Sequence, residues 1–226
     1  MDRDTTSRKF SHQQILKRLQ DGHTDILIGT QMIVKGHDFP NVTFVGVISA
    51  DTSLHFPDYR SSERTFQLLA QVAGRAGRSR LPGEVIIQTF NSGHYSIQRA
   101  KEHDFLGFYR EELRFREALN YPPFSRLVNF RIVGNNEKQA AKVAEEMGRI
   151  GQTLLKTPAS GGIDLLGPSM APLSKVKGKY RWQMLAKGKN SRLLRQFARE
   201  LSSQLEDRIK SAGVHLDIDV DPVFIL

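Results

Sequence analysis

Two adjacent prolines, Pro122 and Pro123, divide this chain of 226 residues into two parts with different patterns of hydrophobic residues. Proline lacks a backbone N–H and disfavours the helical conformation of the residue before it, so a helix cannot run through this pair. Upstream of the pair, helical patterns alternate with short apolar runs. Downstream, the rhythm changes to two strands for each helix. The sequence therefore predicts domains at residues 1–95 and 123–226, joined by a helical linker at 96–122.

The upstream part predicts an α/β domain built on a parallel sheet. Continuous apolar runs, typical of strands buried on both faces, place strands at 25–29, 42–48 and 84–90. Helices are expected to begin at Ser11 and Ser61, where a serine can cap the first turn. Residues 94–120 predict one long helix, or two helices broken near Asp104.

The downstream part predicts a smaller α+β domain. Strands are expected at 126–133, 163–166, 180–186 and 214–221, and helices at 137–156 and 191–212. Gly167, Pro168 and Ser169 are expected to form a turn that ends the second strand. The order β-α-β-β-α-β is that of the ferredoxin-like fold.

Composition excludes several classes of protein and site. The chain has no cysteine, so disulfides, thiolate nucleophiles and cysteine zinc sites are excluded, and its seven histidines lack ligand spacing. No apolar run approaches the roughly 18 to 20 residues of a membrane span, and the first residues do not resemble a signal peptide. We expect a soluble cytoplasmic protein with no membrane partner and no metal site of its own.

Positive charge is concentrated in one segment. The formal net charge is +9, and residues 175–199 contain nine basic side chains and no acidic one: Lys175, Lys177, Lys179, Arg181, Lys187, Lys189, Arg192, Arg195 and Arg199. Such a run is either a solvated face or a nucleic-acid-binding surface.

The predicted elements suggest how this run is arranged. We expect 175–179 and 187–189 in the loops on either side of a strand, and the last three arginines along one side of the next helix, so that all converge on one edge of the domain. Tyr180 and Trp182 are candidates for stacking on bases, although Trp182 is equally expected in the core. The predicted DNA contacts are Lys175, Lys177, Lys179, Arg181, Trp182, Arg192 and Arg195.

Two motifs carry candidate chemistry. In Gln71-Val72-Ala73-Gly74-Arg75-Ala76-Gly77-Arg78, two arginines three residues apart project to nearly the same side, and their guanidinium groups suit phosphate oxygens. Gly74 would allow another backbone or a nucleotide to approach closely. The alternative is an exposed basic helix end. The second motif, residues 29–40, contains Thr30, Gly36 and Asp38 and follows a predicted strand.

Together the two motifs resemble the fifth and sixth motifs of the RecA-like second motor lobe of superfamily-two helicases. Further segments are similar to one family within it, the primosomal replication-restart DNA helicases: residues 2–6, 56–64, 121–124, 166–168, 181–183 and 217–222. The resemblance implies an ATP-dependent 3′–5′ DNA helicase. Such a helicase recognises stalled or branched replication forks and restarts replication by primosome assembly.

The resemblance also implies residue roles. Arg75 and Arg78 would act as arginine fingers on the γ-phosphate of ATP. Gly36, Asp38, Gln71 and Gly74 would lie at the nucleotide, and Thr30 would contact a phosphate of the translocating single strand. The implied partners are branched and single-stranded DNA, the single-strand-binding protein and other primosome proteins, in the bacterial cytoplasm at the nucleoid.

The sequence lacks several parts of such an enzyme. It contains neither the phosphate-binding Walker A motif nor the magnesium-binding Walker B motif. In the family these lie in a first lobe, and eight zinc-binding cysteines lie in an insertion. The chain is therefore expected to be the C-terminal part of the enzyme, inactive alone and sharing ATP and Mg²⁺ with an absent lobe. The alternative is a non-catalytic nucleic-acid-binding or scaffold module.

Overall fold

The computed structural model describes residues 11–30, 42–74, 82–157 and 161–225. The chain divides into two compact units. The first unit comprises Met1–Phe56 and Arg60–Glu111, and the second comprises Pro57–Tyr59 and Glu112–Leu226. Helix α5, Phe105–Ala118, runs through the boundary at residue 111.

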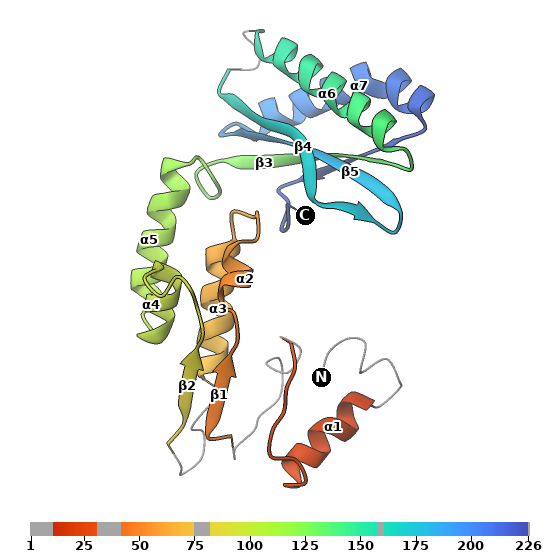
Figure 1. The fold of residues 1–226 in the computed structure, drawn as a ribbon. Coiled ribbons are helices and arrows are strands. Elements are labelled where there is room, and N and C mark those ends of the chain that lie inside the picture. Colours follow the sequence, from red (N-terminus) through yellow and green to blue (C-terminus); the bar gives the residue numbers. More distant parts are fainter. Residues whose placement is uncertain (1–10, 31–41, 75–81, 158–160, 226) are drawn as a thin grey trace. The chain divides into compact units, whose positions relative to one another are not determined.

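The first unit is a mixed α/β arrangement (Figure 1). Its described elements are α1 Ser11–Gln20, β1 Phe44–Val47, α2 Asp51–Leu54, α3 Ser61–Ala73, β2 Glu84–Ile87, α4 Tyr95–Lys101 and the start of α5. Strands β1 and β2 pair in parallel, with Phe44 opposite Glu84 and Val47 opposite Ile87. The parallel sheet expected from the sequence is confirmed for these two strands. The break near Asp104 is also confirmed, because α4 and α5 are separate helices.

The core of the first unit lies where its helices meet one face of β1 and β2. Alternate residues of the strands face this core, so Val47 and Ile87 pack against it while Phe44 and Ile86 are exposed. The rings of Phe66 in α3 and Phe108 in α5 stack with centroids 4.2 Å apart. Burial of these apolar side chains holds α3 and α5 against the strand pair.

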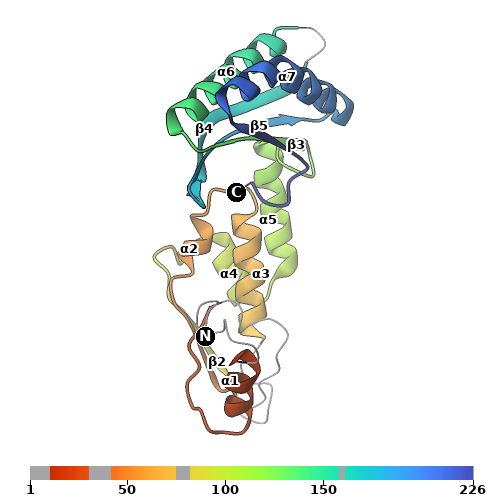
Figure 2. The same cartoon turned by 90° about the vertical axis from the view of Figure 1, so that its right-hand side faces the viewer.

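The second unit contains a four-stranded antiparallel sheet with two helices on one face (Figures 1 and 2). Its elements are β3 Arg126–Gly134, α6 Glu137–Leu155, β4 Ile163–Val176, β5 Lys179–Gly188, α7 Ser191–Ala212 and β6 His215–Val220, in the order predicted. In the sheet, the strands lie in the order β4-β5-β3-β6. The two central strands are therefore β5 and β3.

Local signals in the sequence set the ends of the two helices. The side chains of Asn136 and Asn190 accept hydrogen bonds from backbone N–H groups in the first turns of α6 and α7, as N-caps do. Gly213 ends α7 in the left-handed conformation, with φ 61°. These caps fix where the helices begin and where α7 ends.

Strand β4 is longer than the sequence predicts. It was expected to end at residue 166, yet it continues to Val176. The Gly167–Ser169 segment is not the expected turn but part of an irregularity, where the register with β5 shifts between Leu166 and Ser169. Glycine and proline mark bulges within edge strands as well as turns, so the sequence signal was ambiguous.

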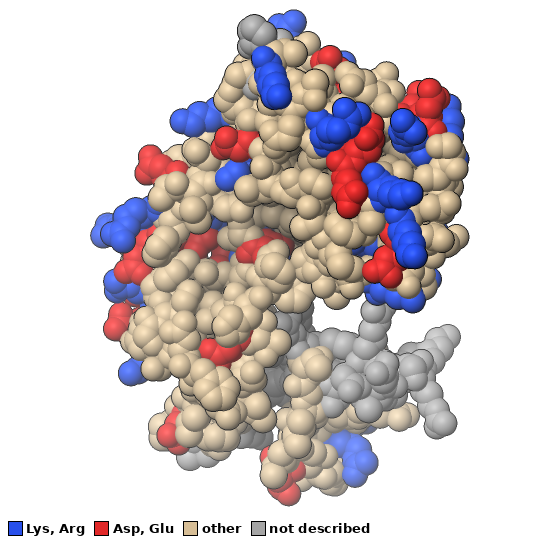
Figure 3. All heavy atoms as spheres, turned by 45° about the horizontal axis from the view of Figure 1, so that its top comes forward, with Lys and Arg blue, Asp and Glu red and all other residues tan. Residues whose placement is uncertain are grey.

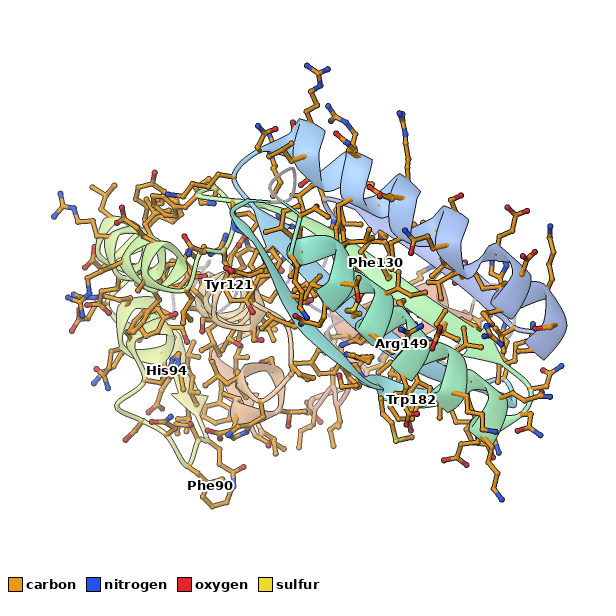
Figure 4. All side chains as sticks on the ribbon, turned by 90° about the horizontal axis from the view of Figure 1, so that it is seen from above. Phe90, His94, Tyr121, Phe130, Arg149 and Trp182 are labelled. Atoms are coloured by element: carbon orange, nitrogen blue, oxygen red, sulfur yellow. The ribbon has the colours of Figure 1, made fainter. Side chains whose placement is uncertain are left out.

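The core of the second unit lies between the sheet and its helices. Phe130 of β3 and Phe197 of α7 are both buried and meet edge to face, with ring centroids 6.3 Å apart. Figure 4 shows Phe130 between α6 and α7 in the view from above. Met147, Met184, Leu194, Leu201 and Leu205 are among the other fully buried side chains of this cluster.

We predict that Leu201→Ala lowers the free energy of unfolding of the second unit by about 2–5 kcal/mol, because it leaves a cavity in this core. The matched substitution Leu173→Ala, at a side chain that is 49% exposed, should cost under about 1 kcal/mol. Urea unfolding followed by the fluorescence of Trp182, the single tryptophan, reports on this unit. Equal losses for both variants would contradict this placement of the core.

Candidate functional site

The carboxyl end of α3 leads into the arginine motif. Gln71 is exposed in the last turn of α3, and Gly74 follows the helix as its C-cap, with its N–H donating to the carbonyl of Ala70 at 3.1 Å. Arg75 and Arg78, predicted as arginine fingers, lie outside the described residues, as do Gly36 and Asp38. Their roles stay predictions.

Gly74 is not required by the conformation of α3. Its φ is −73°, which any residue can adopt. A Cβ atom built on it would lie 3.6 Å from the carbonyl oxygen of Ala70 and 3.7 Å from that of Gln71, both ordinary contacts. Within the described residues, nothing at this position calls for glycine.

Thr30, the predicted contact to single-stranded DNA, is exposed and lies outside any helix or strand. The strand predicted at residues 25–29 is absent from the structure, which is a correction to the sequence analysis. Ile26 and Ile28 are each 77% exposed. A parallel strand is stable only when its backbone pairs with a neighbour, and among the described residues of the first unit strand pairing is limited to β1 with β2.

Asp51 joins the two loops that follow β1 and β2, a role that the sequence analysis missed. Its buried carboxylate accepts hydrogen bonds from the Thr89 hydroxyl at 2.8 Å and from the backbone N–H groups of Phe90 at 2.9 Å and Asn91 at 3.2 Å. The bond from Phe90 is the main cause that lowers the pKa of Asp51, against the opposing effect of burial. An acidic residue four positions after the end of β1 was the available signal.

The backbone of Phe90 is fixed by a hydrogen bond, whereas its side chain is exposed to solvent. Its N–H is bound by Asp51, while its ring is 96% exposed and points away from the loop in Figure 4. The carboxylate of Asp51 thus fixes the backbone of the loop after β2, and this loop presents the ring of Phe90 to solvent.

The basic run begins in the hairpin that joins β4 to β5. Val176 pairs with Lys179, and the two-residue turn between them has positive φ at both Lys177 (49°) and Gly178 (81°), as hairpins with this loop length prefer. Lys175, Lys177 and Lys179 are all exposed. Lys175 lies in β4 rather than in the predicted loop, and its Nζ contacts the hydroxyl of Tyr180 at 3.2 Å. We call these three lysines the hairpin patch.

Two of the predicted DNA contacts, Arg181 and Trp182, lie in β5 and are partly buried. Trp182 is half-buried and packs against the core below the helices, and Figure 4 shows it beside α6. Its indole Nε1 is buried. Arg181 points to the other face and is partly buried, and burial lowers the pKa of its guanidinium, with a further contribution from Arg131. Of the two alternatives for Trp182, the structure supports the core position.

Lys187 was expected in a loop but lies in β5 and is buried. Its Nζ donates to the carbonyl of Leu119 at 2.9 Å and lies 4.7 Å from the centre of the Tyr121 ring. Tyr121 stacks in turn on Tyr59, with ring centroids 5.3 Å apart and planes 4° apart. The guanidinium of Arg116 lies 5.3 Å from the centre of the Tyr59 ring. We call this four-layer arrangement the tyrosine stack.

Two acidic groups accompany the tyrosine stack. Glu112 accepts a hydrogen bond from Arg116 at 2.7 Å within α5. Asp58 is buried and accepts from the N–H of Ile225 at 3.3 Å. Burial, and to a smaller extent the charge of Asp58, raises the pKa of Tyr121. Because Lys187 is buried and its ammonium group contacts the Leu119 carbonyl and the Tyr121 ring, it is a structural residue of the second unit and not part of an open basic surface.

The basic run ends on α7. Arg192, Arg195 and Arg199 are exposed on one side of this helix, as predicted, and line a shallow open hollow of about 860 Å³ together with Gln196, Glu200, Ser203 and Gln204. Exposed Lys189 precedes the helix. We call Lys189, Arg192, Arg195 and Arg199 the helix patch. Figure 3 shows basic side chains over the second unit, with acidic ones between several of them.

The two patches do not converge on one edge, which corrects the expectation from the sequence. The hairpin patch ends with Lys179, which is the first residue of β5 and not part of the predicted loop, whereas the helix patch starts with Lys189 directly after this 10-residue strand and continues along α7. At roughly 3.3 Å per residue, the ends of β5 are about 30 Å apart. The strand that separates the two groups was predicted, but its length of 10 residues was not.

Among residues 11–30, 42–74, 82–157 and 161–225, no helix is both long and apolar enough to cross a membrane. No cluster of histidine and acidic side chains there is suited to hold a metal ion.

Comparisons with known proteins agree with the division of the chain. Residues 4–80 match the helicase conserved C-terminal domain, and residues 117–223 match the primosomal protein N C-terminal domain. The whole chain is 44% identical, over 226 residues, to the replication restart protein PriA of Bacillus subtilis. The chain belongs to the PriA family.

Other PriA proteins match over nearly the same length. The identity is 43% with that of Synechocystis and 41% with that of Treponema pallidum, each over 99% of this chain. The chain spans only 26–33% of the length of these three relatives, and it corresponds to their C-terminal part. The first unit thus includes the helicase C-terminal domain of PriA, a RecA-like lobe.

The hydrogen bonds that the Asp51 carboxylate accepts from Thr89, Phe90 and Asn91 should make the order of this loop depend on pH. Because the pKa of Asp51 is lowered on folding, the stability it contributes is present above its ordinary value of 3.8 and is lost as pH falls through the lower, folded value. Asp51→Asn should speed hydrogen exchange at Phe90 and Asn91 at neutral pH, and the difference from the parent chain should shrink below about pH 4. Exposed Asp25→Asn is the control. A difference that persists unchanged in acid would contradict the role of the charge.

Proposed function

We propose that this chain is the C-terminal part of an ATP-dependent 3′–5′ DNA helicase that recognises stalled or branched replication forks and restarts replication by primosome assembly. The observation that carries the proposal is the match of the whole chain to replication restart proteins, at 44% identity with that of Bacillus subtilis. A non-catalytic scaffold would need neither the arginine motif after α3 nor the motif around Asp38. The helicase proposal accounts for both.

The first unit would supply one half of an ATP site. Arg75 and Arg78 would reach the γ-phosphate, with Gln71, Gly74, Gly36 and Asp38 at the nucleotide and Thr30 on a phosphate of single-stranded DNA. The exposed end of α3 supports this, because the local conformation does not require the glycine at 74, whereas an incoming ligand would. Bound ATP with Mg²⁺ supplies the phosphoryl transfer that powers translocation.

The second unit would bind DNA and protein partners through its basic side chains. We assign it to the ferredoxin-like class, which its element order and the strand order β4-β5-β3-β6 support. Its proposed partners are branched DNA, the single-strand-binding protein and other primosome proteins. The proposed functional boundaries remain 1–95, 96–122 and 123–226, in the bacterial cytoplasm at the nucleoid. Zinc is proposed for the longer protein and has no cysteine ligands here.

This chain alone should show no DNA-stimulated ATP hydrolysis, because the phosphate-binding and magnesium-binding motifs are absent from its sequence. A coupled phosphate-release assay with and without single-stranded DNA measures it. Mixing in a separately expressed first motor lobe should raise turnover if the two halves assemble. Robust hydrolysis by this chain alone, surviving further purification, would overturn the proposal.

In the full-length protein, Arg75→Ala and Arg78→Ala should each lower ATP turnover by about 10³-fold, since an arginine finger stabilises charge in the transition state. DNA affinity should change little. Arg80→Ala is a matched control, because this arginine lies just outside the motif. Full turnover in both motif variants would remove the arginine-finger assignment while leaving the DNA-binding proposal open.

A further inference from the structure

We infer that Tyr59 is a positioning residue for the arginine motif that follows α3. The second unit holds the tripeptide Pro57–Tyr59 through the tyrosine stack, and this contact fixes the start of the helix whose other end leads into the motif. The inference rests on the proposed function, because it takes the arginine motif as part of an ATP site. It adds that the second unit affects ATP turnover without touching the nucleotide.

The tripeptide belongs to the second unit, although the chain on both sides of it belongs to the first. Asp58 is buried and accepts a hydrogen bond from the backbone N–H of Ile225 at 3.3 Å. The Tyr59 ring stacks on that of Tyr121, and the guanidinium of Arg116 lies 5.3 Å from its centre. Three parts of the second unit, in α5, in the turn after it and near the C-terminal end, therefore hold two adjacent residues.

The loop that contains the tripeptide is short and closed. The hydroxyl of Ser61, the first residue of α3, donates a hydrogen bond back to the carbonyl of Phe56, on the other side of the tripeptide. Arg60 is the single residue between Tyr59 and the helix, and its carbonyl already accepts from the N–H of Arg64 at 2.9 Å. Because no flexible stretch separates Tyr59 from α3, holding its ring also holds the first turn of the helix.

Helix α3 does not begin as α6 and α7 do. Asn136 and Asn190 cap those two helices with side-chain hydrogen bonds, whereas Arg60, at the N-cap position of α3, makes no such bond to the first turn in the described part of the chain. Ser61, which the sequence suggested as a cap, donates to the Phe56 carbonyl instead. A helix without a side-chain cap opens more readily at its first turn. The contacts of the tripeptide are therefore well placed to stabilise this turn.

The other end of α3 leads into the arginine motif. The helix runs for 13 residues, roughly 20 Å, and buries Phe66 and Leu69 in the core of the first unit. Its C-cap, Gly74, is followed in sequence by Arg75. A continuous helix is stiff, so a displacement of its start is transmitted to its end.

A small displacement of this kind should lower turnover more than binding. A catalytic group misplaced by about 1 Å can lower a rate about 100-fold. An arginine finger stabilises charge that develops in the transition state, so an error in its position lowers kcat and leaves the ground-state binding of ATP nearly unchanged. This difference separates a positioning role from a general loss of folded protein.

The test measures ATP turnover by the full-length protein with saturating single-stranded DNA. Tyr59→Ala should lower kcat about 10-fold, while KM for ATP and the affinity for single-stranded DNA change less than about 2-fold. Tyr59→Leu, which keeps apolar volume but cannot stack, should behave like Tyr59→Ala. Tyr59→Phe keeps the ring and should retain kcat within about 2-fold of the parent protein.

A double-mutant cycle shows whether Tyr59 acts through the stack. Tyr121→Ala removes the partner ring from outside the loop before α3, and it should lower kcat about 10-fold as well. The double variant should also be about 10-fold slower than the parent, rather than about 100-fold, because both substitutions remove one contact. The matched control is Leu201→Ala, which weakens the core of the second unit away from the stack and should keep kcat within about 2-fold at a temperature where the variant is folded.

Hydrogen exchange in the 226-residue chain supplies a measurement that needs no activity. Tyr59→Ala and Tyr59→Leu should each speed exchange about 10-fold at the Arg64 N–H, which bonds within the first turn of α3. The backbone N–H groups that pair β3 with β5 serve as the internal reference, because they report whether the second unit is folded. Unchanged exchange at Arg64 in both variants would contradict the link between Tyr59 and the helix.

The outcomes separate this inference from the proposed function. A parent protein that does not hydrolyse ATP would refute the proposed function and the inference with it. Hydrolysis by the parent with an unchanged kcat in Tyr59→Ala, or an additive double variant, would overturn the inference while leaving the helicase proposal intact. An equal loss of kcat in Leu201→Ala would also overturn it, because a general loss of stability would then explain the effect.

Discussion

The second unit is held together near one end of β5 by a partly buried stack in which two cations enclose two tyrosine rings. Arg116 comes from α5, Tyr59 from the segment before α3, Tyr121 from the turn before the double proline, and Lys187 from β5. Each cation–π contact contributes roughly 0.5–2 kcal/mol when desolvated, and the ring pair about 0.5–1.5 kcal/mol more. Three segments distant in sequence, around residues 59, 116–121 and 187, thereby meet at one end of β5. The hairpin patch leads into that strand, and the helix patch starts directly after it.

This arrangement changes the meaning of the basic run. Nine cations that look equivalent in sequence have three different environments. Lys187 is buried, Arg181 is partly buried, and the remaining seven form two exposed patches. From net charge alone, all nine cations would be counted as available to bind an anionic ligand. The structure leaves seven, in groups of three and four, and gives each group a separate position.

The sequence predicted most elements of the second unit and fewer details of the first. Helices α6 and α7 were predicted close to their observed bounds, and the asparagine caps that begin them are local features of the sequence that the prediction did not use. The length of β4 was not predicted, because Gly167 and Pro168 interrupt a strand without ending it. The missing strand at 25–29 and the buried Lys187 depend on partners remote in sequence, which no local pattern encodes. The exposed placement of the three arginines along one side of α7 was predicted, while their role as DNA contacts stays a prediction. The hydrogen bonds of Asp51 to the loop after β2 were missed, and Arg75 and Arg78 lie outside the described residues.

The membership of Pro57–Tyr59 in the second unit makes that unit discontinuous along the chain. A fragment starting at Glu112 would retain every strand of its sheet and both helices, yet would lose the ring that covers Tyr121 and the carboxylate that holds the N–H of Ile225. Gene fusions and domain exchanges cut at the double proline would therefore separate pieces of one packing unit. Residues that are neighbours along the chain therefore do not always belong to the same compact unit. Pro57–Tyr59 is covalently part of the segment that forms the first unit, yet it packs with the second.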